Sequence, residues 1–345
     1  MTIIEMIQEQ DKNNQLAVLI NSYRQIEYSW SKKISVTQIK VDKISNIVVT
    51  GLGGSAIGGE LLSNFLKEEL KVPYFVNRNY ELPSFAGENS LVIASSYSGN
   101  TEETICALNE AIERRAQIIC LTTGGEVQEI CKKGNIPYFE LQKGFQPRYA
   151  LWGNFFALLK IVESLKLVAS QEKIVLSIIE LLKSRGEELS GGKNSALEIA
   201  EKLCGYIPVI YSVSDYTSSV GTRFKGQINE NSKLHAFCNF FPEMNHNEII
   251  GWETVYAKQF KCKAVFIYDE SYNDRVKKRF EIVSDLIKQT GTEIITLKSN
   301  QTEYKLRLMD LIFLGDFISY YLAIIRGYDP STIKNINYLK EKLAT

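Results

Sequence analysis

"NIVVTGLGGSAIGGELLSNFL", residues 46–66, runs from an apolar, β-branched segment through a glycine-rich turn into a helical pattern. The first five residues predict a buried strand, and the apolar spacing after the glycines predicts a helix. A glycine turn at a helix N-terminus lets backbone N–H groups approach an anion, and the helix dipole favours negative charge there. A tight turn that needs positive φ is the alternative interpretation. The stretch therefore predicts an α/β unit and a candidate anion site.

The alternation of strand and helix recurs along the whole chain. Further strands are expected at "VPYFVNRNYELP", "LVIAS", "AQIICLTT", "IPYFELQ", "IPVIYSV", "KLHAFCNF", "AVFIYDE" and "TEIITLK". Strands separated by helices predict parallel sheets with helices on both faces, and ligands bind such sheets outside the carboxyl ends of the strands. We therefore expect an α/β protein with two similar halves, each a parallel sheet flanked by helices.

Two segments outside this alternation also carry expectations. Residues 2–32 have an apolar periodicity that predicts a helix. The polar, glycine-containing segment "KSRGEELSGGKNS", residues 183–195, is typical of a connection. We expect the junction of the two halves in the neighbourhood of residues 165–195.

Composition excludes several classes of protein. The 345 residues contain 40 Lys and Arg against 40 Asp and Glu, which argues against a general nucleic-acid binder. No basic segment followed by an apolar block opens the chain, and no apolar run suggests a membrane span, so we expect a cytoplasmic protein without a membrane partner. The six cysteines form no CxxC pair, which predicts free, mostly buried thiols and no zinc site. Only His235 and His246 can supply an imidazole.

A second loop follows the predicted strand "LVIAS". "SSYSGNTEET", residues 95–104, places the hydroxyls of Ser96, Ser98 and Thr101 at the start of a predicted helix. Such a cluster is either an N-cap in a serine-rich turn or a phosphate clamp built from hydroxyls and backbone amides. The glycine-rich loop of the first motif and this serine-rich loop would open at the same edge of the sheet. This placement favours the phosphate clamp.

Five motifs in their order along the chain carry a resemblance to a known family. They are "GLGGSAIGG", "SSYSGNTEET", "QPRYALW", "KGQINENSK" and "FPEMNHNEIIGW". The chain resembles the bifunctional phosphoglucose/phosphomannose isomerases of the sugar-isomerase (SIS) domain superfamily from about residue 47 to the closing "NINYLKEKL". The first two motifs are widespread among SIS proteins, whereas "NENSK", "NHNE" and "PRYA" are more specific to this family.

The resemblance implies two SIS domains, which we place at residues 1–170 and 171–345, and a homodimer. It implies reversible isomerisation of glucose 6-phosphate or mannose 6-phosphate to fructose 6-phosphate, a reaction of glycolysis and gluconeogenesis, without a metal or other cofactor. Whether both aldose phosphates are used stays open; a hydroxyl residue near the C-terminus, such as Thr332, is one candidate for that choice.

The resemblance also implies roles for individual residues. Glu230 corresponds to the base, His246 to the ring-opening histidine donated across the dimer, and Arg148 to the cation beside the enediolate. Lys340 corresponds to an acid/base lysine in ring opening, although Lys334 and Lys342 lie close in sequence. The implied phosphate-binding positions are Gly54, Ser55, Ser96, Ser98 and Thr101. A proton transfer between adjacent carbons needs a base and a stabilised oxyanion, which these residue types supply.

Two other classes of function compete with an isomerase of these hexose phosphates. A non-catalytic SIS regulator would need both phosphate loops but not Glu230, Arg148 or His246. An SIS isomerase for another sugar phosphate would share the first two motifs. An aminotransferring relative normally adds a glutaminase domain, which these residues do not contain.

Overall fold

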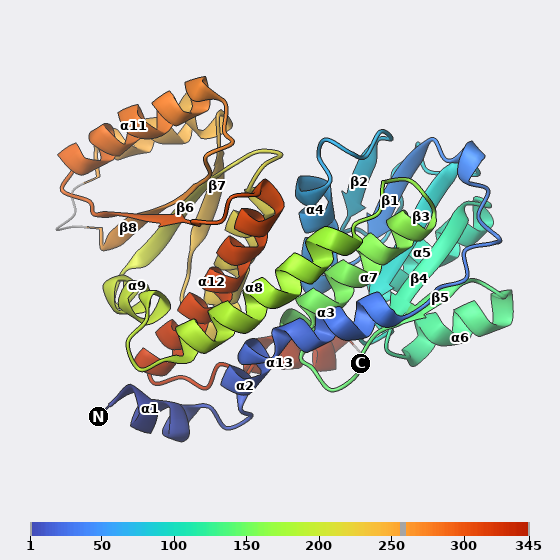
Figure 1. Ribbon diagram of the computed structural model, residues 1–345, viewed down its shortest axis with the longest axis horizontal. Coiled ribbons are helices and arrows are strands. Elements are labelled where there is room, and N and C mark those ends of the chain that lie inside the picture. The colour runs from blue at the N-terminus through green and yellow to red at the C-terminus, as the bar shows by residue number, and fades with distance from the viewer. Residues whose placement is uncertain (1, 256–259, 344–345) are drawn as a thin grey trace. The chain divides into compact units, whose positions relative to one another are not determined.

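The computed structural model describes residues 2–255 and 260–343, and the chain divides into two compact units (Figure 1). The first-sheet unit is Ser22–Glu180, and the second-sheet unit is Met1–Asn21 together with Leu181–Thr345. The division falls inside helix α8 (Glu172–Ser190). The expected domain limits, 1–170 and 171–345, refer to SIS domains and stay a prediction; the compact units assign the first 21 residues to the C-terminal half.

Five parallel strands form the sheet of the first-sheet unit, in the order β2-β1-β3-β4-β5. They are β1 (Asn46–Thr50), β2 (Tyr74–Asn77), β3 (Ser90–Ser96), β4 (Gln117–Thr122) and β5 (Tyr138–Glu140). Strand β2 lies on one side of β1, and β3, β4 and β5 follow one another on the other side. The switch point, where ligands bind sheets of this order, therefore lies between β1 and β3.

Helices cover both faces of this first sheet. On one face, α5 (Glu102–Glu113) and α6 (Gly125–Gly134) pack against alternate side chains of the strands, among them Val48 and Val92. On the other face, α4 (Gly54–Phe65) approaches Val49 at Gly59. Helix α7 (Leu151–Ser164) packs on α4, and α3 (Ser22–Ser31) donates from Ser29 to the carbonyl of Gly153 in α7 at 2.9 Å.

The second sheet repeats the same strand order with one strand fewer, β7-β6-β8-β9. Its parallel strands are β6 (Ile207–Val213), β7 (Phe237–Phe241), β8 (Cys262–Tyr268) and β9 (Ile294–Lys298). All nine expected strands are present, which confirms two similar α/β halves.

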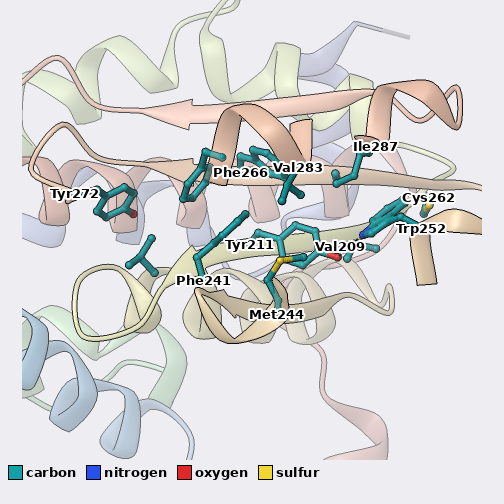
Figure 2. Packing of buried hydrophobic residues seen from close by; sticks show 13 residues of the cluster. Val209, Tyr211, Phe241, Met244, Trp252, Cys262, Phe266, Tyr272, Val283 and Ile287 are labelled. Carbon is teal, nitrogen blue, oxygen red and sulfur yellow. Dashed lines mark hydrogen bonds between the residues drawn. The ribbon is translucent and has the colours of Figure 1, made fainter. Parts of the chain in front are cut away.

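Two different sets of helices cover the second sheet. Figure 2 shows one face, where Tyr211, Phe241 and Phe266 of the strands pack against α11 (Asp274–Gln289). The short helices η3 (Glu243–His246) and η4 (Glu248–Glu253) lie on this side as well. On the other face, α10 (Ser218–Ser232) meets β6 and β7 where a Cβ at Gly221 would contact Ser212 and Cys238.

Helices α9 (Ser195–Leu203), α12 (Tyr304–Ile325) and α13 (Lys334–Leu343) complete the second-sheet unit. Among the described residues, α12 alone is long and apolar enough to cross a membrane by length and composition. Since 94% of its apolar window is buried within the protein, α12 is accounted for as a core helix. The six cysteines are free; Cys120, Cys131 and Cys262 are buried, and Cys106 is exposed.

The expectation of a single helix over residues 2–32 is wrong. Three helices, α1 (Ile3–Gln10), α2 (Gln15–Ile20) and α3, occupy this stretch. Asp11 ends the first helix, because its carboxylate accepts hydrogen bonds from the backbone N–H groups of Gln15 at 2.7 Å and Leu16 at 2.9 Å. The chain turns at Asn14, whose φ is 50°. Periodicity alone does not detect such a break, because the apolar residues on both sides stay in phase.

The expected connection at residues 165–195 is also mostly helical. Helix α8 continues to Ser190 because Val175, Ile178, Leu182 and Leu189 give it a buried apolar stripe. Only about four residues, from Gly191 to Asn194, separate it from α9.

Asp11 also accepts a hydrogen bond from the hydroxyl of Tyr320 in α12 at 2.9 Å, so it ties the N-terminal helices to the core of the second-sheet unit. We expect Asp11→Ala to lower the free energy of unfolding by about 1–2 kcal/mol, the usual cost of a lost helix cap. Urea titration followed by circular dichroism measures this change. Asp42→Ala, which removes an exposed aspartate, is the matched control, and equal stability of the two variants would contradict the capping role.

Candidate active site

The first glycine loop, Gly51–Gly54, joins β1 to α4 at the switch point of the first sheet. Gly53 is the N-cap of α4 with a φ of 52°, and no side chain caps this helix end. A Cβ at Gly51 would lie 2.6 Å from the carbonyl oxygen of Ser95, and one at Gly54 would lie 2.6 Å from that of Pro147. The glycines therefore allow backbone segments to pack directly on one another. The carbonyl of Leu52 accepts from the first-turn amides of Ser55 at 3.0 Å and Ala56 at 3.4 Å.

The second loop, Ser96–Thr101, joins β3 to α5. Ser96 is buried and its hydroxyl lies 2.8 Å from that of Thr101, while the N–H of Gly99 donates to Ser96 Oγ at 3.1 Å. Ser98 is exposed at the tip of the loop. Thr101 is the N-cap of α5, as one interpretation of the motif predicted, but its side chain caps no amide of the helix. The first-turn amides of α5 are therefore left without a cap from this residue.

A third loop, Thr122–Gly125, supports the second one. A Cβ at Gly99, whose φ is 74°, would collide with the carbonyl oxygen of Gly124. In return, the second loop caps α6: Gly99 O accepts from Val127 N, and Asn100 Oδ1 accepts from Glu126 N, both at 3.0 Å. The sequence analysis assigned no role to this loop, although its glycine pair after a predicted strand was a usable signal.

Arg148 lies in the 3-10 helix η2 (Pro147–Tyr149), immediately before α7, and only 3% of its surface is exposed. Gln25 of α3 fixes this turn, donating to the carbonyl of Tyr149 at 2.8 Å and accepting from the N–H of Gly153 at 3.2 Å. Asn154 of α7 donates to Ser95 Oγ at 2.7 Å. The structure thus brings Arg148 and the two loops together at one edge of the first sheet.

Six predicted site residues are therefore clustered in the first-sheet unit: Gly54, Ser55, Ser96, Ser98, Thr101 and Arg148. Sequence reasoning missed the two residues that hold the cluster, Gln25 and Asn154. Both are buried amides. Asn154 lies among apolar residues of α7, and that contrast is a signal that could have found it, whereas Gln25 shares the buried face of α3 with Ser22 and Ser29.

Glu230 lies near the end of α10 in the second-sheet unit and is half-buried. The other residues of its motif serve the fold. Asn229 donates to the carbonyl of Leu234, Asn231 to Ser319 Oγ, and Ser232 to the carbonyl of Ser319. Lys233 ends the helix with a φ of 50° and donates to two carbonyls.

His246 is exposed at the end of η3, after β7. Its neighbours also serve the fold. Asn247 caps η4 by accepting from Glu248 N at 2.6 Å, and Glu248 accepts from the hydroxyl of Tyr211 at 2.6 Å. Asn239 donates to the second oxygen of Glu248, so this carboxylate is held at the face of the sheet.

The remaining candidates lie near the C-terminus of the second-sheet unit. Lys340 lies on α13, whose described residues are all exposed. Thr332 is half-buried in the preceding loop, and its hydroxyl donates to the carbonyl of Asp329 at 3.2 Å. His235, which the sequence analysis did not place in the site, is exposed between α10 and β7. Glu230, His246 and Lys340 thus lie on three separate elements.

The switch point of the second sheet, between β6 and β8, differs from the first. Ser212 at the end of β6 and Ser214 and Thr217 in the following loop have the spacing found for Ser96, Ser98 and Thr101. Here the left-handed position is Asp215, with a φ of 62°, in place of a glycine. The hydroxyl of Thr217 accepts from the N–H of Val213 and is hydrogen-bonded to the buried hydroxyl of Tyr272. The backbone and a side chain of the protein therefore occupy the hydroxyl of Thr217, whereas the buried hydroxyl of Ser212 has no hydrogen-bond partner among the described residues.

This pair of parallel sheets with a loop site at one switch point defines a class: proteins with two SIS domains. Two family models agree, one described as the SIS domain over residues 40–129 and one as the bacterial phospho-glucose isomerase C-terminal SIS domain over residues 192–343. The crystal structure of a hypothetical protein from Thermus thermophilus has the same fold, with a TM-score of 0.75 at 13% identity over 99% of this chain and 94% of that chain. The predicted fold class is confirmed.

Sequence relatives identify the family within this class. A bifunctional phosphoglucose/phosphomannose isomerase from Caldicellulosiruptor bescii is 40% identical over 92% of this chain and 94% of the relative. One from Aquifex aeolicus is 39% identical over 86% of this chain and 90% of the relative. The chain belongs to the bifunctional phosphoglucose/phosphomannose isomerase family, and it is an isomerase.

Two substitutions in the loops distinguish a role in anion binding from a role in the structure of the turns. We expect Ser98→Ala to weaken the binding of inorganic phosphate at least about tenfold, because a hydrogen bond to a charged group is worth about 1.5–3 kcal/mol. Gly54→Ala should weaken phosphate binding and also lower the melting temperature, since its Cβ displaces the Pro147 carbonyl.

Calorimetric titration with phosphate and thermal unfolding of the same samples provide the two measurements. Gly87→Ala is the control in the same unit, because a Cβ there meets nothing within 4 Å. Normal phosphate affinity in both site variants would mean that these residues serve only the turns.

Proposed function

We propose that this isomerase interconverts glucose 6-phosphate, mannose 6-phosphate or both with fructose 6-phosphate through an enediolate intermediate. One observation carries the proposal. At a single switch point, the start of α5, where the N-cap Thr101 caps no amide with its side chain, lies beside the glycine loop before α4, Ser96 and buried Arg148. A helix N-terminus without a side-chain cap, together with nearby hydroxyl donors, suits a phosphate dianion.

The proposed reaction moves one proton between neighbouring carbons. Glu230 removes the proton from C2 of the open-chain aldose phosphate and returns it to C1, while the hydroxyl proton at O2 passes to O1. Arg148 stabilises the charge that develops on the two vicinal oxygens, because a planar guanidinium donates to both. Ring opening comes first and needs an acid and a base, the proposed roles of His246 and Lys340. Atoms and electrons balance without a redox cofactor or a metal.

The choice of Glu230 and His246 rests on their accessibility and their chemistry. Glu230 is half-buried and His246 exposed, so a ligand can reach both. A carboxylate and an imidazole are side-chain types that can transfer a proton near neutral pH. The adjacent polar side chains hold the local fold: Asn231 and Ser232 bind α12, and Asn247 and Glu248 fix η4.

The assembly and location form part of the same proposal. We expect a cytoplasmic homodimer in which each subunit donates His246 to the active site of its partner; the exposure of His246 supports such a donation. Six free thiols suit a reducing compartment. Thr332, whose hydroxyl is held at the loop before α13, is the candidate for admitting both C2 epimers.

Measuring turnover of the two hexose phosphates distinguishes the proposed function from two alternatives. A regulator with an SIS fold would bind sugar phosphates without converting them, and an enzyme for another sugar phosphate would convert neither hexose phosphate. Coupled assays with glucose 6-phosphate and with mannose 6-phosphate, each in excess, decide between these functions and also show which epimers are used.

Removing the proposed base tests the mechanism. We expect Glu230→Gln to lower turnover by about 10²–10⁴-fold, because the amide keeps the shape of the side chain but cannot take a proton. Fructose 6-phosphate should still bind, as measured by calorimetry. Glu201→Gln, an exposed glutamate of α9 in the same unit, is the control and should retain full activity. A Glu230→Gln enzyme with a tenth of normal turnover or more would require another base.

Mixing two inactive variants tests the donated histidine. Glu230→Gln and His246→Asn proteins are mixed, dissociated in mild denaturant and allowed to reassociate. In a mixed dimer, one site would combine an intact Glu230 with an intact His246 of the partner, because a two-fold axis relates the subunits. Activity should therefore reappear. If both residues act within one chain, every active site contains one substituted residue and the mixture stays inactive.

A further inference from the structure

Helix α10, which carries Glu230, is attached to α12 by a polar stripe. Arg223, Gln227 and Asn231 recur every fourth residue and are at most 5% exposed. Residues at this spacing lie on one side of a helix. The apolar residues Phe224 and Ile228 lie beside the stripe, where Gly315 of α12 lets Phe224 approach the helix backbone.

The first contact of the stripe is a buried ion pair. Arg223 donates from Nε to Asp316 Oδ1 and from Nη2 to Asp316 Oδ2, both at 2.8 Å. Gln227 adds a third hydrogen bond to Asp316 Oδ1 at 3.0 Å. Burial raises the pKa of the Asp316 carboxyl, and the charge and hydrogen bonds of Arg223 oppose that shift.

The second contact lies directly beside Glu230. Asn231 Nδ2 donates to Ser319 Oγ at 3.0 Å, and Ser232 Oγ donates to the carbonyl of Ser319 at 2.7 Å. Arg326, just after α12, donates to the carbonyl of Ser232 at 3.0 Å. The last turn of α10 is thus held at three points, all within two residues of Glu230.

Stability does not explain why these groups are polar. A buried ion pair contributes little compared with apolar side chains of similar volume, because both charges lose their hydration. Directional hydrogen bonds do, however, fix how a helix is rotated about its own axis. Since side chains reach about 5–6 Å from that axis, a rotation of about 20° moves a carboxylate by about 2 Å. A misplacement of about 1 Å in catalytic geometry costs about 10²-fold in rate.

We propose that Arg223 with Asp316, and Asn231 with Ser319, are positioning residues that set the rotation and register of α10 and so aim Glu230 at its substrate. The inference rests on the proposed role of Glu230 as the base. These residues do not contact substrate; they act through the helix that carries Glu230.

A pair of double variants tests the proposal. Arg223→Met with Asp316→Leu removes both charges together and leaves no single buried charge. The control is Arg307→Met with Asp269→Leu. This second buried ion pair, with contacts of 2.7 and 2.9 Å, joins α12 to the end of β8 and does not touch α10. For each enzyme we measure kcat and KM for fructose 6-phosphate and the melting temperature.

We expect the first double variant to lose at least tenfold in kcat, with KM within twofold of normal and a melting temperature within about 4 °C of the wild type. The control should keep kcat within twofold. Ser319→Ala, a smaller change, should lower kcat in the same direction, and Ser319→Thr, which keeps the hydroxyl, should restore most of it.

Three results are decisive against the proposal. Normal kcat in both the Arg223/Asp316 variant and Ser319→Ala overturns it, as does an equal loss of kcat in the control pair. A loss of kcat that tracks loss of folded protein in every variant, Ser319→Thr included, assigns the residues to stability alone. A wild-type enzyme that leaves fructose 6-phosphate unchanged contradicts the proposed function itself, which distinguishes that failure from the others.

Discussion

Direct packing of backbone on backbone holds the functional edge of the first sheet together. Gly51 lies against the carbonyl of Ser95, Gly54 against that of Pro147, and Gly99 against that of Gly124. Four segments that are far apart in sequence meet there only because none of these positions carries a Cβ. The starts of α4 and α5 and the turn of Arg148 take their positions from these contacts. The glycines of this edge therefore serve packing, and the anion binding that we propose would use the same backbone, so the two interpretations drawn from the sequence are not exclusive.

Much of this architecture is predictable from sequence because buried parallel strands are short apolar runs with clear limits. "NIVVT" and "IPVIYSV" are short β-branched runs that predict buried strands. The alternation of strands and helices then predicts the layers. The break at Asp11 and the continuation of α8 through a polar segment could not be predicted from apolar periodicity. Asp11 accepts hydrogen bonds from the N–H groups of Gln15 and Leu16 and from the hydroxyl of Tyr320, and the apolar side of α8 is buried in spite of its polar composition.

The candidate site also contains some residues that the sequence predicts and others that it does not. Ser96, Ser98 and Thr101 were recognisable because hydroxyls between a strand and a helix can cap the helix or bind an anion. Glu230 and His246 come from a family resemblance, and their roles stay predictions. The roles of Gln25 and Asn154 could not be predicted, because the role of a single buried amide depends on its hydrogen-bond partner. Residues that support a site from a distance in sequence are the hardest to find without coordinates.

The closed switch point of the second sheet has a consequence for how such a protein can change over time. Opening the loop after β6 to a ligand would break the buried contact between Thr217 and Tyr272 and leave each hydroxyl with one hydrogen bond fewer, which lowers stability before any ligand binds. The second switch point is therefore an unfavourable place for a new binding site to arise by single substitutions.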